Sequence, residues 1–103
     1  TGGSQGLGRC TATRLHAAGA TVGVNYFPDP QGLNRARAEE TVAALGERAF
    51  AVSGDVRETA DAAHMCDELV ARTGRLDIVV NNAAIIRDRT LKKMTDAEWH
   101  DVI

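Results

Sequence analysis

A run of closely spaced glycines opens the chain and is its first feature that could do chemistry. It reads Thr1-Gly2-Gly3-Ser4-Gln5-Gly6-Leu7-Gly8 and stands directly before a segment of helical periodicity. Glycine lets the backbone approach a ligand closely, and the first turn of the helix that follows offers free N–H groups to an anion. The alternative is a tight turn that only packs a helix on a sheet. A P-loop is disfavoured, because no Lys and hydroxyl residue follow the last glycine.

Polar side chains also follow two apolar segments later in the chain. Asp55-Val56 comes after residues 48–53, and Asn81-Asn82-Ala83-Ala84 ends the apolar run that begins at Leu76. Ligands of open α/β sheets bind at the carboxyl ends of strands, which is where we expect Asn82. Asn81 is expected to brace neighbouring strands, as buried amides usually do. Asp55 has a plainer alternative role, which is to cap the loop before the next helix.

The other reactive residue types form no cluster. His16, His64 and His100 are far apart and lack metal-ligand spacing, so no metal site is expected. Cys10 and Cys66 fall on helical faces, where they are expected to be small core residues rather than nucleophiles. They form no C-x-x-C pattern, so the reducing cytoplasm is the expected compartment.

The composition of the 103 residues is that of an ordinary globular domain, with 44% hydrophobic and 25% charged residues and a net charge of -2. These values exclude the collagen-like, low-complexity and disordered classes. The apolar runs are far shorter than the roughly 20 residues that cross a bilayer. No basic run extends beyond Lys92-Lys93, so a small molecule is a better candidate partner than nucleic acid or a membrane surface.

Helical and extended segments alternate along the chain. Helices are predicted at Leu7–Ala18, Arg35–Leu45 and Thr59–Thr73. Strands are predicted at Ala20–Tyr26, Arg48–Ser53 and Leu76–Asn82. The last is apolar enough to be buried on both faces of a parallel sheet. Thr95 and Glu98 have the capping-box spacing that starts a final helix. This alternation predicts an α/β fold with a doubly wound parallel sheet.

The glycine run and the two polar motifs together resemble the short-chain dehydrogenase/reductase family. The family's glycine signature is T-G-x-x-x-G-x-G, which Thr1–Gly8 matches, and its fourth strand ends in N-N-A-G, which Asn81–Ala84 resembles. Ala84 replaces the final glycine, a small steric change that we expect to be tolerated. Asp55-Val56 matches the end of the third family strand. The resemblance covers the whole chain and implies a Rossmann-like fold, with residues 1–103 as part of a single NAD(P)-binding domain.

The resemblance also implies a reaction. Residues 81–88 and 91–99 look most like 3-oxoacyl-acyl-carrier-protein reductases and acetoacetyl-coenzyme A reductases. Such enzymes interconvert a ketone, here a 3-oxoacyl thioester, and a secondary alcohol by hydride transfer. Sugar and polyol dehydrogenases share much of the pattern, and a non-catalytic NAD(P)-binding or scaffold protein is a further alternative. Trp99 resembles a family position that packs the last helix on the sheet, so a core position is expected.

The residues that the resemblance assigns to the cofactor lie in four segments: Gly2, Ser4, Gln5, Gly6, Leu7, Asn25, Tyr26, Asp55, Val56, Asn82, Ala83 and Ala84. The glycine loop would hold the pyrophosphate and the adjoining ribose. Asp55 would accept from the adenine amino group while the Val56 backbone fixes the edge of the ring. Asn82 would lie against the cofactor ribose.

The choice between NAD and NADP depends on the second family strand. An acidic side chain about 20 residues after the glycine motif would bind the ribose 2′-hydroxyl of NAD. Here the strand ends in Asn25-Tyr26-Phe27 and Asp29 comes late, which favours NADP over NAD. Gln5 stands where many NADP-preferring relatives carry Arg. Arg35 and Arg37 could supply the positive charge instead.

The family's catalytic Ser and Tyr-x-x-x-Lys are not among these residues, because Pro30 stands four positions after the single tyrosine, Tyr26. A catalytic Asn would fall just after Ile103. We therefore expect an incomplete sheet, with the first strand and the C-terminal half of the enzyme missing. The full-length protein is expected to be a homo-oligomer, a tetramer or dimer. Without a strand before Thr1, these residues alone are expected to be marginally stable or unfolded.

Overall fold

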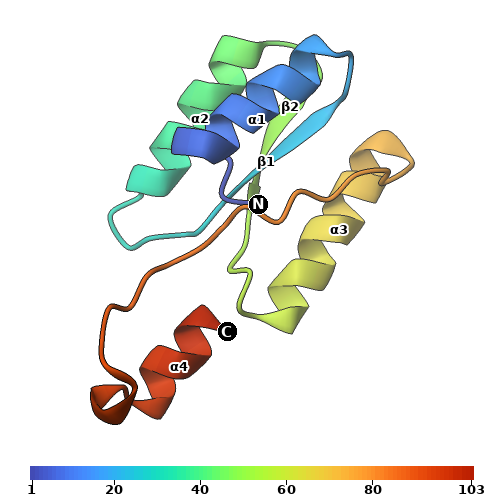
Figure 1. Cartoon of the computed structure of the whole chain (residues 1–103). Coiled ribbons are helices and arrows are strands. Elements are labelled where there is room, and N and C mark those ends of the chain that lie inside the picture. Colours follow the sequence, from blue (N-terminus) through green and yellow to red (C-terminus); the bar gives the residue numbers. More distant parts are fainter.

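Two parallel strands, β1 (Val22–Tyr26) and β2 (Ala49–Ser53), form the sheet in the computed structural model, which describes residues 1–103. Val22 lies opposite Ala49, and the register continues to Tyr26 opposite Ser53. Figure 1 shows helices α1 (Gly6–Ala17) and α2 (Leu33–Leu45) together on one side of the strands and α3 (Thr59–Thr73) on the other. The α/β class and the incomplete parallel sheet that the sequence predicts are confirmed.

Side chains along β1 alternate between the two faces of the sheet, and this alternation determines which of them form the hydrophobic core. Val22 and Val24 face α1 and α2 and are buried with Ala12 and Ala38. Gly23 points to the opposite face, where a Cβ atom would come within 2.7 Å of the Leu69 side chain on α3. A glycine in the middle of a strand therefore lets α3 approach the sheet closely.

Helix α2 begins two residues earlier than predicted, at Leu33 rather than Arg35. The Asp29 carboxylate accepts hydrogen bonds from the backbone N–H groups of Leu33 (3.0 Å) and Asn34 (2.8 Å). These bonds, chiefly the one from Asn34, lower the pKa of Asp29. Asp29 therefore acts as the cap of α2, because it satisfies two N–H groups that the first turn leaves unpaired.

The C-terminal segment contains a short 3-10 turn, Leu91–Lys93, and helix α4 (Asp96–Val102). The predicted capping box is confirmed: the Thr95 hydroxyl accepts from the Glu98 N–H, and the Glu98 carboxylate accepts from the Thr95 N–H. In Figure 1 this helix stands away from the sheet. Trp99 is consequently 46% exposed, and its predicted core position is wrong.

Cys10 and Cys66 are also exposed, so their predicted core positions are wrong. Both lie on faces of α1 and α3 that no other element covers. They are free thiols in the structure. None of the helices is both long enough and apolar enough to cross a membrane.

The strand predicted at Leu76–Asn82 does not form. Ile78 and Val79 are 62% and 57% exposed, although the segment was expected to be buried on both faces. A groove of about 360 Å³ separates this segment from β1, and Val22, Val24, Leu69 and Val80 help to line it. A strand needs a neighbour for its backbone hydrogen bonds, and the groove leaves this segment without one.

We expect the isolated 103-residue chain to lack a cooperative thermal transition. Only 11 of its residues are buried, and apolar side chains on both sides of the groove are unpaired. A five-residue Val- and Ile-rich extension before Thr1 should fill the groove and produce a cooperative transition. Circular dichroism melting of both chains tests this, with a Gly- and Ser-rich extension as control. A sharp transition of the unextended chain above about 50 °C, ordinary for a mesophilic domain, would contradict the expectation.

Candidate cofactor site

The glycine loop, defined as residues 2–8, leads into α1 and leaves several backbone donors free. The N–H groups of Gly6, Leu7 and Gly8 form no hydrogen bond with the rest of the chain. Gly6 has a φ of 54°, and a Cβ atom there would meet nothing within 4 Å. Free N–H groups at the positive end of a 12-residue helix, beside open space, are suited to bind an anion such as a pyrophosphate.

Gly8 is required for a different reason. A Cβ atom at this position would lie 2.2 Å from the Gly2 carbonyl oxygen and 2.6 Å from the Asn82 side-chain nitrogen. The start of α1 therefore packs directly on the segment at residues 1–2 and on Asn82. Any side chain at Gly8 would push the helix away and open the loop.

Asn82 connects the segment that ends the apolar run at residues 76–82 to Thr1, 81 positions away in the sequence. Its side-chain amide donates to the carbonyl oxygens of Thr1 (3.1 Å) and Gly2 (3.3 Å). The Thr1 hydroxyl in turn accepts from the backbone N–H groups of Asn82 and Ala83, both at 3.1 Å. Asn81, by contrast, is exposed and makes no hydrogen bond, so the bracing role predicted for Asn81 is wrong and belongs to Asn82.

Asn25, at the carboxyl end of β1, is only 7% exposed and is bonded on both sides. Its side-chain oxygen Oδ1 accepts from the Gly2 N–H (3.0 Å), and its side-chain nitrogen Nδ2 donates to the Gly54 carbonyl oxygen (3.0 Å). The backbone adds a bond from the Gly3 N–H to the Asn25 oxygen and one from the Gly54 N–H to the Tyr26 oxygen. One buried amide thus links the glycine loop to the loop that follows β2.

Asp55 lies next to this link, and its carboxylate is held within its own loop. The Arg57 guanidinium donates to both carboxylate oxygens, at 2.7–3.1 Å, and the Arg57 N–H donates to one of them. The side-chain bonds from Arg57 lower the pKa of Asp55. The Asp55 N–H donates to Asp61 at the start of α3. In this structure the carboxylate organises the loop, and contact with adenine stays a prediction.

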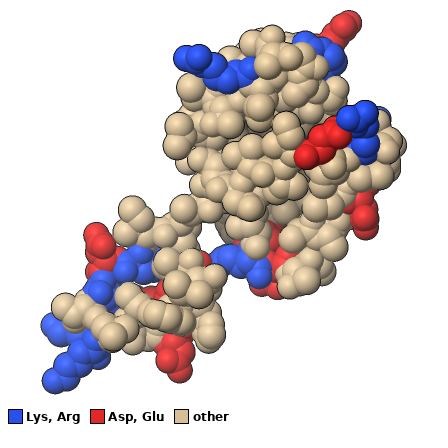
Figure 2. All heavy atoms as spheres, turned by 45° about the vertical axis from the view of Figure 1, so that its right-hand side comes forward, with Lys and Arg blue, Asp and Glu red and all other residues tan.

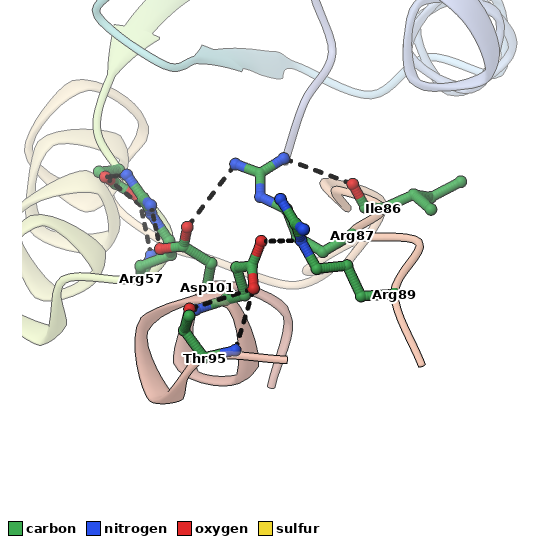
Figure 3. Close-up of polar contacts among 8 residues, drawn as sticks. Arg57, Ile86, Arg87, Arg89, Thr95 and Asp101 are labelled. Atoms are coloured by element: carbon green, nitrogen blue, oxygen red, sulfur yellow. Dashed lines mark hydrogen bonds and ion pairs between the residues drawn. The ribbon is translucent and has the colours of Figure 1, made fainter. Parts of the chain in front are cut away.

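Arg57 also attaches the C-terminal segment to this loop, as Figure 3 shows. Its second terminal nitrogen donates to Asp101 on α4 at 2.7 Å, and Arg87 lies 3.6 Å from the other oxygen of Asp101. Arg89 pairs with Glu98 on the same helix. These pairs are partly exposed, and such pairs contribute at most about 1 kcal/mol each.

Figure 2 shows the charged side chains on one face of the molecule. In Figure 2 acidic and basic side chains gather where the C-terminal segment meets the rest of the molecule. Elsewhere on that face both signs are interspersed, with no broad basic surface of the kind that binds nucleic acid.

The expected cofactor residues converge on the carboxyl ends of β1 and β2. Ser4 and Asn25 are buried; Gly2, Tyr26, Asp55 and Asn82 are half-buried; Gln5, Gly6, Leu7, Val56, Ala83 and Ala84 are exposed. The Ser4 backbone oxygen accepts from the Thr41 hydroxyl at 3.4 Å. The Ser4 hydroxyl itself has no partner in the chain and is not fully enclosed. The sequence prediction did not include Arg57 or the junction role of Thr1. A carboxylate two residues before an arginine was the available signal for the first.

Comparisons of the sequence and the fold with known proteins identify the family of the chain. The sequence profile described as short chain dehydrogenase matches residues 1–103. The chain belongs to the short-chain dehydrogenase family. Among solved structures, a short-chain dehydrogenase/reductase mutant from Serratia marcescens matches with a TM-score of 0.86 and 27% identity, over 98% of this chain and 40% of that one.

Several curated short-chain dehydrogenase relatives match the whole chain. The 3-oxoacyl-[acyl-carrier-protein] reductase FabG of Staphylococcus aureus is 39% identical over 104 residues, and the acetoacetyl-CoA reductase of Allochromatium vinosum is 40% identical over 106. The hydroxyacyl-CoA dehydrogenase ChsB1 of Mycobacterium tuberculosis is 45% identical over 108. The chain spans 41%, 42% and 33% of their respective lengths.

The buried amide of Asn25 gives a stability prediction. Asn25→Asp keeps the acceptor for the Gly2 N–H but loses the donor to Gly54 and places a carboxylate against its carbonyl oxygen. We expect a loss of about 1–3 kcal/mol in the free energy of unfolding, measured by urea denaturation of the full-length protein. Asn81→Asp is the matched control and should change stability by less than about 0.5 kcal/mol. Equal effects of the two substitutions would contradict the role assigned to Asn25.

Proposed function

We propose that this chain is the cofactor-binding part of an NAD(P)(H)-dependent oxidoreductase that interconverts a 3-oxoacyl thioester and the corresponding 3-hydroxyacyl thioester. The observation that carries the proposal is the junction of the glycine loop with Asn82, together with the unpaired N–H groups of Gly6, Leu7 and Gly8 and the open space beside Gly6. Residues 1–103 are then one part of a single Rossmann domain.

The chain's own groups have separate tasks in this proposal. The free N–H groups of Gly6 and Leu7 bind the pyrophosphate, and the Ser4 hydroxyl donates to the same region. The side-chain nitrogen of Asn82 is bonded to Thr1 and Gly2. This leaves the side-chain oxygen of Asn82 to accept from a ribose hydroxyl. Asp55 and the Val56 backbone border the adenine. The bound nicotinamide supplies the hydride.

The names of the relatives support the substrate class. One acts on 3-oxoacyl groups carried by a protein, one on acetoacetyl-CoA and one on hydroxyacyl-CoA. All three are acyl thioesters by these names, which favours this class over the sugars and polyols of the alternative hypothesis. Reduction of the ketone also needs a proton donor for the carbonyl oxygen. Tyr26 is the single tyrosine, and no lysine stands four positions after it, so we assign the proton donor to residues outside 1–103.

The proposal also includes the cellular compartment and the oligomeric state of the enzyme. We assign it to the cytoplasm, in line with two free cysteines and no disulfide pattern. We also expect a homo-oligomer.

A charge placed in the anion site tests the proposal. Gly6→Asp introduces a carboxylate into open space, and Gly6→Asn introduces a neutral side chain of the same size. Both residues tolerate positive φ better than most, so the pair isolates the charge. In the full-length protein we expect the Asp variant to bind NADP at least tenfold more weakly than the Asn variant, by isothermal titration calorimetry.

Activity assays of the full-length wild-type protein distinguish the oxidoreductase from the non-catalytic scaffold. Reduction of acetoacetyl-CoA with either cofactor supports the oxidoreductase, while cofactor binding without turnover of any ketone leaves the scaffold alternative. Equal affinities of the Asp and Asn variants would contradict the placement of the pyrophosphate. Failure of the wild-type protein to bind either nucleotide at millimolar concentration would refute the function.

A further inference from the structure

Two arginines, Arg35 and Arg37, lie on α2, and the structure separates their roles. Arg35 donates to Glu39 at 2.8 Å, a pair within one turn of the exposed helix face. Arg37 is half-buried, and its guanidinium donates to the side-chain oxygen of Gln5 at 2.7 Å. Gln5 directly precedes Gly6, so the Arg37 guanidinium lies beside the open space at the start of α1.

The charge of Arg37 is not neutralised by its partner. A glutamine amide is neutral, and no carboxylate lies within 4.0 Å of the Arg37 guanidinium. Arg9, the other arginine facing α2, pairs with Glu40. Arg37 is therefore an arginine at this edge of the glycine loop that has no ion pair and whose guanidinium is oriented by a neutral side chain.

Asp29 is the acidic group whose charge interacts with that of Arg37. Asp29 lies in the segment after β1, where a carboxylate would bind the ribose 2′-hydroxyl of NAD. Its oxygens instead accept from the Leu33 and Asn34 N–H groups at the start of α2. The pKa of Asp29 is lowered chiefly by the bond from the Asn34 N–H and, to a smaller extent, by the positive charge of Arg37. The carboxylate is therefore ionised, but its two oxygens are directed at the start of α2 rather than at the glycine loop.

We propose that Arg37, held in place by Gln5, binds the 2′-phosphate of NADP and gives the protein its preference for NADP over NAD. This inference rests on the proposed dinucleotide site and specifies its selectivity. Gln5 acts as a positioning residue: its side-chain oxygen orients a guanidinium that reaches the loop from another helix, 32 positions away. An arginine offers a planar set of donors that suits a phosphate, and an exposed one gains much from being oriented in advance.

Dissociation constants of the full-length protein for NADP and NAD, measured by calorimetry, test this inference. Arg37→Gln should weaken NADP binding about 10- to 100-fold, the effect of removing one charge-assisted contact. NAD binding should change less than twofold, because NAD has no phosphate at that position. Arg35→Gln is the matched control, since it removes the same charge from the same helix, and it should change neither constant more than twofold.

A double-mutant cycle of Gln5→Ala and Arg37→Gln tests the role of Gln5. Gln5→Ala should weaken NADP binding severalfold in the wild-type background and have little further effect in the Arg37→Gln background. Additive effects of the two substitutions would show that Gln5 does not act through Arg37.

The outcomes distinguish this inference from the proposed function. Equal losses from Arg37→Gln and Arg35→Gln, a parallel loss of NAD binding, or a wild-type preference for NAD would each overturn the role of Arg37 while leaving the dinucleotide site intact. Absence of binding of both nucleotides to the wild-type protein would instead overturn the proposed function. A tight 2′,5′-ADP complex with weak 5′-AMP binding, lost in Arg37→Gln, would support the inference directly.

Discussion

The side-chain amide of Asn25 is the interaction on which the candidate site depends. It accepts from the Gly2 N–H and donates to the Gly54 carbonyl oxygen, so it ties the glycine loop and the loop after β2 to the end of one strand. An amide has both a donor and an acceptor, which no carboxylate or aliphatic side chain of this size offers. Because Asn25 is buried, an unpaired group here would be costly, and the two loops are held at a fixed separation.

Close packing of α1 against residues 1–2 also positions the glycine loop. Gly8 brings the first turn of α1 against the Gly2 carbonyl oxygen, and Asn82 bonds the same oxygen from the other side. The N–H groups of Gly6, Leu7 and Gly8 have no partner within the chain, and the space beside Gly6 is open. The family's glycine pattern has a physical reason in this structure, since Gly8 needs the room and Gly6 needs the positive φ.

The sequence predicted the helices better than the sheet. Helix Thr59–Thr73 and the capping box at Thr95 are local features, set by periodicity and by side chains a few residues apart, and both are confirmed. The strand at Leu76–Asn82 failed because a strand depends on a neighbour, which no local pattern reports. The cap of α2 by Asp29 was missed because two prolines around it indicated only a loop.

The site was predictable where it is encoded in motifs and hidden where it depends on the fold. The glycine loop and Asn82, both identified from motifs, are in contact through the bond from the Asn82 side chain to the Gly2 carbonyl oxygen. Asn25 was expected to face the cofactor, whereas its amide is bonded within the chain. The contact between Arg37 and Gln5 joins residues 32 positions apart on different elements, and no spacing rule would find it.

The most direct test of the account is a nuclear magnetic resonance titration of the ¹⁵N-labelled full-length protein with NADP. The account predicts that the largest amide shifts fall on Gly6, Leu7 and Gly8, whose N–H groups are free in this structure, with smaller shifts at Ala83 and Val56. Shifts confined to α4 or to the groove beside β1, with the glycine loop unchanged, would contradict it.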